Sequence, residues 1–227
     1  MLTKLRTLVL VVRHREFGEI IHEFRRRFWS TEVSFCLSRD LTVPFEAPRA
    51  RLPFTIRELQ PSDHPEILHE RPRRLSMLCS HVPTCYVAVG DNGEIAYMQW
   101  LMTATSNDAI RQIFGGRVPP LDADEALLEF AYTFKAWRGK NVMPRAMALI
   151  AERAGEQGCR HVMTFVREEN VPALKGCQRA GFHMYRRQAV TWRLFCRIGV
   201  KTTDFAPGTR YPFEAAAQPA KKDLSVA

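Results

Sequence analysis

The hydrophobic pattern is clearest between Leu127 and Phe182, where short apolar runs alternate with a segment of helical period. The run from Leu127 to Phe134 has the length of a strand and contains a single acid, Glu129. After it, apolar residues recur at the spacing of one helix face: Met143, Ala146, Met147, Ile150 and Ala154. Gly158 is placed to end that helix, and the next run, 161–166, predicts a buried strand.

A second helix is predicted after this strand. Asn170 is a preferred N-cap residue, Gly181 is placed to end the helix, and Phe182 begins another strand. The order strand, basic loop, helix, strand, helix predicts a parallel crossover in a mixed α/β (α+β) domain. The basic loop, 135–141, precedes a helix N-terminus, where free N–H groups and the helix dipole favour a phosphate. Taken alone, such a loop is more often a solvated surface.

The first thirty residues form a different kind of segment. Apolar residues from Leu5 to Phe28 fall on one helical face, and seven Lys and Arg residues against three Glu give residues 1–30 a net charge of +4. Such a helix packs on the protein's own core or on a second copy, or lies on an anionic membrane. The interleaved glutamates favour packing over membrane contact. Residues 1–53 are therefore assigned as a basic amphipathic helical extension and linker, with 33–37 as a candidate extra strand.

The remaining pattern predicts one main domain over residues 54–199. Its expected elements are a first strand from Phe54, a helix capped by Ser62 or Asp63 with a second piece through Cys79, a hairpin over 85–102 around Asp91-Asn92-Gly93, a loop with one helical turn over 106–125, and a half-buried strand over 190–196. The segment 200–227 is rich in Ala, Pro and Lys near its end, and we expect a disordered tail.

Composition narrows the class of protein. With 227 residues and 46% hydrophobic residues, the chain suits one good-sized core with extensions. The formal charge of +9 favours an anionic partner, but no nucleic-acid recognition module is present in the sequence, so nucleic acid is not expected. Six cysteines without metal-ligand spacing predict free thiols, no metal and a cytoplasmic location. No apolar run approaches the ~18 residues that span a bilayer.

Two stretches carry a family resemblance. WRGKNVMPRAMALI, from Trp137, resembles the acyl-CoA loop of the GNAT N-acyltransferase superfamily, usually Arg-Gly-Lys-Gly-Ile-Gly. VREENVPALKGCQRAGF, from Val166, resembles the second signature of that family, and the two stand in the family's order and separation. The resemblance covers roughly residues 54 to 196. It implies a central twisted sheet with a splayed parallel strand pair, and a bacterial transferase that moves an acetyl or other short acyl group from acyl-CoA to an amine.

The chain departs from the family pattern at three positions. Asn141 and Met143 stand where the family usually has glycines in the loop, although Asn tolerates left-handed dihedrals better than most residues. Pro144 directly after Met143 fits a first helical turn. Cys177 stands where many relatives have the tyrosine that protonates the departing thiolate. A thiol, with a pKa near ~8.5, can donate a proton or serve as a small core residue.

The resemblance also implies roles for individual residues. A backbone N–H within Tyr132, Thr133 and Phe134 would hold the cofactor carbonyl. The cofactor's phosphates would lie on Arg138, Gly139, Lys140, Asn141, Val142 and Met143, and Asn170 would contact its pantetheine arm. Glu129 is our predicted base, because an acid inside an apolar strand is costly unless it faces a polar cavity. The alternative for Glu129 is a structural role as a salt-bridged or sheet-edge carboxylate. Tyr132, His183 and a base acting through water are weaker candidates for removing the proton.

The resemblance implies that the acceptor is a primary amine of a small molecule. Chains with a basic helical N-terminal extension resemble members of the family from bacterial surface-polysaccharide clusters, which suggests an amino sugar or its nucleotide conjugate. Two alternatives keep the same fold: a regulatory module that binds acyl-CoA with little turnover, and a transferase that uses aminoacyl-tRNA. A homodimer is compatible with all of these.

Overall fold

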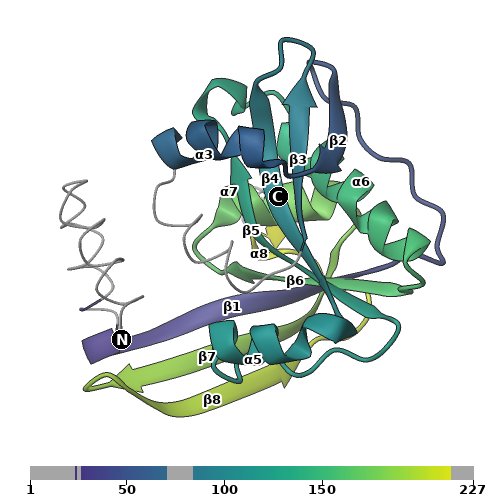
Figure 1. Ribbon diagram of the computed structural model, residues 1–227. Helices are drawn as coiled ribbons and strands as arrows, with labels where there is room; N and C mark the ends of the chain where they lie inside the picture. The colour runs from purple at the N-terminus through teal and green to yellow at the C-terminus, as the bar shows by residue number, and fades with distance from the viewer. Residues whose placement is uncertain (1–23, 25–26, 71–83, 216–227) are drawn as a thin grey trace, which may run out of the picture.

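The computed structural model describes residue 24 and residues 27–70 and 84–215, which form one eight-stranded mixed sheet flanked by helices (Figure 1). The strand order is β2-β3-β4-β5-β6-β1-β7-β8. The strands are β1 (Trp29–Asp40), β2 (Phe54–Glu58), β3 (Cys85–Gly90), β4 (Ile95–Thr103), β5 (Glu125–Thr133), β6 (His161–Arg167), β7 (His183–Arg193) and β8 (Cys196–Asp204). The longer helices are α3 (His64–Glu70), α5 (Asn107–Phe114), α6 (Val142–Glu156) and α7 (Val171–Arg179), with a short α8 (Pro212–Ala215). The predicted mixed fold is confirmed.

The predicted crossover is present between β5 and β6, the parallel pair of the sheet. Helix α6 connects them and packs on β4 and β5. Four residues of its predicted apolar stripe, Ala146, Met147, Ile150 and Ala154, are buried. The amphipathic period therefore placed this helix correctly, because its apolar face meets the sheet.

Strand β1 lies between β6 and β7 in the sheet and pairs antiparallel with both. The sequence predicted a short extra strand at 33–37, but the strand runs from Trp29 to Asp40. Only Phe35, Cys36, Leu37 and Arg39 are buried, so most of the strand carried no apolar signal. The segment assigned as a helical extension thus contributes an interior strand of the sheet. Most of the predicted helix over 1–30 lies outside the described residues.

The predicted boundary at 53/54 coincides with the start of β2, whereas the boundary at 199/200 falls inside regular structure. Strand β8 crosses position 199 and ends at Asp204, and α8 lies within the segment expected to be disordered. All nine residues of β8 are exposed, so the strand is held by its pairing with β7 rather than by a buried face. Cys196, Ile198 and Val200 alternate with Arg197, Gly199 and Lys201, but the boundary predicted at 199 divides this pattern.

The loop predicted over 106–125 contains a two-turn helix, α5, longer than the single turn expected. Gly115 ends it in the left-handed conformation, with φ of 58°. The side-chain amide of Asn107 both donates to the Leu121 carbonyl (3.0 Å) and accepts from its N–H (2.8 Å), which fixes the rest of the loop. The β3–β4 hairpin is confirmed, with Gly93 at φ 82° in its turn.

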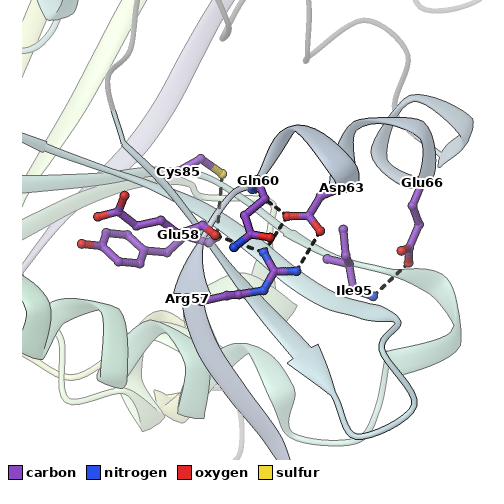
Figure 2. A network of polar contacts seen from close by, with 8 residues as sticks. Arg57, Glu58, Gln60, Asp63, Glu66, Cys85 and Ile95 are labelled. Atoms are coloured by element: carbon purple, nitrogen blue, oxygen red, sulfur yellow. Dashed lines mark hydrogen bonds and ion pairs between the residues drawn. The ribbon is translucent and has the colours of Figure 1, made fainter.

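Polar contacts join β2 to the start of α3 (Figure 2). Both oxygens of the buried Asp63 carboxylate accept from the Arg57 guanidinium, at 2.6 and 2.8 Å. These bonds hold the pKa of Asp63 below its usual range, although burial opposes them. Asp63 also accepts from the Gln60 N–H, and Gln60 is the N-cap of η1 (Pro61–Asp63), rather than Ser62 or Asp63 as predicted. This network positions α3, whose last residue, Glu70, accepts a hydrogen bond from Tyr132 of the cleft described next.

Candidate active site

The parallel strands β5 and β6 are paired at one end only. Pairing joins Glu125–Leu127 to His161–Met163, and beyond these residues the strands run on to Thr133 and Arg167 without pairing to each other. A cleft of about 1320 Å³ is lined by these unpaired segments, the first turns of α6 and α7, and the connector at 49–51. The splayed pair expected from the sequence is therefore present.

A bulge in β5 lies at the start of the gap. The pairing of β4 with β5 slips between Met98 and Trp100, so that two residues of β5 face one residue of β4. One of the two, Phe130, has φ of 59°, a left-handed conformation that costs a non-glycine residue about 1–3 kcal/mol. Its ring stacks on Phe114 of α5, with 5.6 Å between centroids. Packing from α5 thus holds the strained backbone in place.

The backbone N–H of Thr133 faces the gap. The next N–H along the chain, of Phe134, donates to the Ala96 carbonyl of β4 at 3.1 Å. Successive N–H groups of a strand point to opposite edges, so Thr133 directs its own toward β6. Of the N–H groups predicted to hold a carbonyl, the Phe134 group is already used within the sheet, and the Thr133 group is directed into the cleft.

The Glu129 carboxylate reaches across the gap from β5 to β6. Its Oε1 accepts from the backbone N–H of Phe165 at 2.8 Å and from the Thr164 hydroxyl at 3.5 Å. The carboxylate supplies the acceptor that the β5 backbone would supply if the strands were still paired. Glu129 is half-buried and lines the cleft, so the predicted base lies in the site with one oxygen oriented by β6.

Cys177 lies on α7 beside the cleft and is almost fully buried. Its thiol donates to the sulfur of Met147 at 3.8 Å. Burial raises the pKa of the Cys177 thiol well above its ordinary value, and the nearby negative charge of Glu129 adds to the effect. The thiol therefore keeps its proton at neutral pH.

The basic loop begins with the short helix η3 (Lys135–Trp137) and continues to Asn141. The Arg138 guanidinium donates to the Tyr132 hydroxyl at 3.1 Å and to the Thr133 carbonyl at 3.2 Å, which holds it at the end of β5. Tyr132 in turn donates to Glu70, the last residue of α3, at 2.8 Å. Gly139 adopts φ of 73°, where a glycine is favoured.

The connector before β2 runs beside this loop, which the sequence did not indicate. Asn141, the N-cap of α6, has φ of 60°, and its side-chain amide donates to the Arg49 carbonyl. The Arg51 N–H donates to the Lys140 carbonyl at 2.9 Å. These bonds place Arg49 and Arg51 along the cleft together with Arg138. As predicted, Asn141 takes the left-handed conformation in the position where the family has glycine.

Met143 and Asn170 shape the two helix N-termini at the cleft. Met143, in the first turn of α6, packs so closely on α7 that a Cβ added to Gly176 would lie 2.7 Å from its sulfur. Met143 therefore fills space between the helices. Asn170 is the N-cap of α7, as predicted, and its side chain accepts from the Ala173 N–H at 3.3 Å. Val142 is buried, whereas His183 is exposed and is not among the cleft-lining residues.

Sequence reasoning missed the polar residues that β1, β4 and β7 contribute. The Tyr97 hydroxyl donates to Oε1 of Gln99 at 2.7 Å, and both residues are fully buried and line the cleft. The Nε2 of Gln99 has no hydrogen-bond partner in the described part of the chain. Glu32, Ser34 and Gln188 line the cleft as well. The one amide in the apolar run 95–102 was a signal for Gln99; no local signal pointed to the others.

Charge in the cleft is unevenly distributed. Five basic residues that line it form no ion pair with any other described residue: Arg49, Arg51, Arg138, Lys175 and Arg179. They come from the connector, the loop before α6, and α7. The acidic lining residues are Glu32 on β1 and Glu129 on β5. Such a cleft suits an anionic ligand held near helix N-termini.

The described residues contain no group of three or more His, Cys, Asp and Glu side chains arranged to hold a metal ion. Nor does any helix among them have the length and apolar character needed to cross a membrane.

Comparison with known proteins agrees with this geometry. The family model described as acetyltransferase (GNAT) family matches residues 54–182. Among solved structures, a GCN5-related N-acetyltransferase from Sphaerobacter thermophilus has a TM-score of 0.51 and 17% identity, over 85% of this chain and 58% of that one. A GNAT-family acetyltransferase from Colwellia psychrerythraea has a TM-score of 0.50 and 11% identity, over 78% and 57%.

A third structure is a GCN5-related glucosamine N-acetyltransferase region of a fungal multi-domain GH3 β-N-acetylglucosaminidase. Its TM-score is 0.50 with 13% identity, over 78% of this chain and 23% of that one. At these identities the structures show a shared fold. The chain spans less than two thirds of the length of each of these three structures. No curated protein sequence matches the chain.

Proposed function

The chain belongs to the acetyltransferase (GNAT) family, and from this premise we propose that it transfers an acetyl or another short acyl group from acyl-CoA to a primary amine of a small molecule in the cleft. Acyl transfer to nitrogen needs a polarised carbonyl, an amine without its extra proton, and a leaving thiol. The cleft offers a residue for each of the first two.

The observation that carries the proposal is the unpaired edge of β5. An amide-containing arm such as pantetheine can pair with a free strand edge, as a peptide does in strand addition. The bound acyl-CoA supplies an activated acyl group as its thioester. The Thr133 N–H is placed to donate to the carbonyl oxygen and to stabilise the negative charge that develops there.

The residues around α6 fit the phosphate groups of the same ligand. The helix begins at Val142, and its first N–H groups are free of intrahelical partners. Arg138, Arg49 and Arg51 stand beside that N-terminus without carboxylate partners in the described residues. A polyanion would offset this concentration of positive charge.

Glu129 is the residue we assign to remove the proton of the attacking ammonium, directly or through water. The bond from Phe165 fixes one carboxylate oxygen, so the group is oriented before the substrate arrives. Cys177 is assigned to packing beside the site. Its raised pKa makes it a weaker acid than an ordinary thiol, so proton donation to a departing CoA thiolate would be uphill.

The acceptor is proposed to be a polar, hydroxyl-bearing amine such as an amino sugar or its nucleotide conjugate. Glu32 can attract an ammonium group, and Ser34, Gln99 and Gln188 offer hydrogen bonds to hydroxyls. The fungal structure that shares the fold acts on glucosamine, which supports testing this class first.

The test is isothermal titration with acetyl-CoA, followed by thiol release across a panel of amino sugars, polyamines and amino acids. Arg138→Glu should weaken acetyl-CoA binding by ~10-fold or more, because a charge-assisted contact becomes repulsive. Arg160→Glu, an exposed site on the loop before β6, is the matched control and should bind normally. Unchanged affinity of the Arg138→Glu variant for acetyl-CoA would show that the ligand does not bind at this loop.

A second candidate is a module that binds acyl-CoA without turnover. The buried thiol of Cys177, in the position where many relatives have a tyrosine, favours it. Acetyl-CoA binding with no thiol release for any amine would support this candidate. Turnover with aminoacyl-tRNA but not with acetyl-CoA would instead support the tRNA-dependent alternative.

A further inference from the structure

Exposed apolar side chains gather at one end of the sheet, away from the cleft loop. Of the twelve large hydrophobic side chains that are exposed in the described residues, seven lie here: Phe24, Phe28, Trp29, Leu194, Phe195, Ile198 and Val200. We call this end, formed by residues 24, 27–29 and 193–201, the hairpin tip. In Figure 1 it is the free end of the β7–β8 hairpin beside the start of β1. A contiguous apolar patch on an exposed surface marks a contact site.

The two residues of the turn at the tip are not those that would make the turn most stable. Arg193 pairs with Cys196, which leaves Leu194 and Phe195 as a two-residue loop. Their φ angles are 46° and 67°, the positive values that such a hairpin turn requires. Asn-Gly is the pair that adopts this conformation without strain. Two bulky apolar residues held there at a cost, with Leu194 64% exposed, indicate that the side chains serve a contact.

The tip is held rigidly by the residues before β1. The N–H of Leu194 donates to the Phe28 carbonyl at 2.7 Å, and that of Phe195 donates to the Arg27 carbonyl at 2.9 Å. The Phe195 ring meets Phe24 and Phe28 edge-on, at 4.6 and 5.9 Å between centroids. The apolar surface is therefore preformed and projects beyond the sheet.

Positive charge surrounds this surface. Arg193, Arg197 and Lys201 lie at or beside it, and the segment 191–203 contains no Asp or Glu. The Arg193 guanidinium lies over the Trp29 ring at 4.0 Å. Apolar aromatic side chains interspersed with arginines are the composition that binds at a lipid headgroup boundary.

We propose that the hairpin tip binds the surface of an anionic membrane, with Leu194 and Phe195 inserted among the headgroups. A second copy of the chain fits the tip poorly, because a two-fold contact would bring Arg193, Arg197 and Lys201 against the same three cations of the other copy. An anionic lipid surface is complementary to both the charge and the apolar side chains. Glu32 of the cleft is three residues along β1 from Trp29, roughly 10 Å, so the acceptor side of the cleft would lie near the lipid.

The test is co-sedimentation of the full chain with phosphatidylcholine vesicles, with and without phosphatidylglycerol. The key variant is Leu194→Asn with Phe195→Gly, which removes the apolar pair and installs the favoured turn. Relief of the strained turn offsets the loss of the Phe195 ring contacts, so the variant should remain folded. We expect the parent to bind the anionic vesicles, less so at high salt, and the variant to bind ~10-fold more weakly. Leu68→Asn, which removes an exposed apolar side chain from α3, is the control and should bind like the parent.

Three results would overturn the proposal. The first is no binding of the parent to anionic vesicles. The second is equal binding by the parent and the Leu194→Asn/Phe195→Gly variant, which would assign any membrane contact to another segment. The third is binding of an acidic protein at the tip in preference to vesicles. It is measured by letting the acidic protein compete with vesicles for the parent and for the Leu194→Asn/Phe195→Gly variant. None of these results depends on acyl-CoA binding or turnover.

Discussion

Glu129 accepts from the backbone N–H of Phe165 the hydrogen bond that the β5 backbone does not accept. A buried N–H without a partner costs about 1–3 kcal/mol, so two strands cannot separate inside a core unless other acceptors replace the lost ones. The carboxylate does this at the closed end of the gap. The same side chain thus helps to keep the cleft open and is the base we propose for the reaction.

These two roles can be separated by substitution. Glu129→Gln retains a side-chain oxygen that can accept from Phe165, but it loses the charge and the basicity. We expect normal folding, nearly unchanged acetyl-CoA affinity, and turnover at saturating acceptor lower by ~10²–10⁴, the usual worth of a positioned base. The deficit should shrink as pH rises, because free amine then becomes abundant without help. The measurement is a pH–rate profile of both proteins with one working acceptor.

Glu129→Ala provides the contrast, because it removes the acceptor as well. It should lower the free energy of unfolding by about 1–3 kcal/mol, which urea denaturation can measure. If the Glu129→Gln variant instead has the turnover of the parent and the same acidic limb in its pH–rate profile, Glu129 is not the base and only bridges the two strands.

The parts of this structure that the sequence predicted are those with local signals. The stripe of α6, the cap at Asn170 and the glycine stops each depend on neighbours within a few residues, so the crossover and its loop could be placed in advance. The position of β1 could not, because pairing with β6 and β7 joins residues more than a hundred positions apart. The acceptor side of the cleft is built largely from that pairing, which is why Glu32 and Ser34 were missed while the anion loop was found.

The thiols offer a test of Cys177 that does not need a substrate. Burial raises the pKa of Cys36 to about 12 and that of Cys177 well above its ordinary value, whereas Cys196 is exposed. Since only the thiolate reacts, the thiols of Cys36 and Cys177 should stay unmodified by iodoacetamide up to pH ~9, while Cys196 is alkylated. Mass spectrometry of the native protein identifies the modified sites.

Activity of Cys177→Ala completes this test. If the thiol only packs against Met147, the variant should retain turnover within a few-fold and lose a little stability. A loss of ~100-fold in turnover with intact acetyl-CoA binding would restore Cys177 as a proton donor.

The place of β1 in the sheet predicts a sharp boundary for truncation. Removal of residues 1–23 leaves every described strand in place, so the remaining chain should fold cooperatively and bind acetyl-CoA. Removal of residues 1–41 deletes a strand that buries Phe35, Cys36 and Leu37 and leaves β6 and β7 without their shared partner. That form should show no cooperative thermal unfolding by circular dichroism. Normal folding of the shorter form would mean that β6 and β7 can pair directly.

Arg49 and Arg51 should recognise the part of CoA that extends furthest from the thioester. Their backbones are fixed to Lys140 and Asn141, so both residues lie at the cleft near the start of α6, without an acidic partner in the described residues. CoA carries a 3′-phosphate on its ribose, and dephospho-CoA lacks it. Replacement of both arginines by Ala should weaken CoA binding by roughly 10-fold and dephospho-CoA binding much less, because a contact to a doubly charged phosphate is lost only in the first case.

Calorimetric titration of the parent and the double variant with CoA and dephospho-CoA measures the coupling free energy between the two arginines and the 3′-phosphate. Arg160→Ala serves as the control for net charge and should leave both affinities unchanged. The salt dependence gives a second measure: the slope of CoA affinity with ionic strength should fall in the double variant, since fewer cations meet the phosphates. If the double variant weakens both ligands equally, the arginines act on the pyrophosphate or on the loop itself. In that case the 3′-phosphate lies elsewhere, and the connector only supports Asn141.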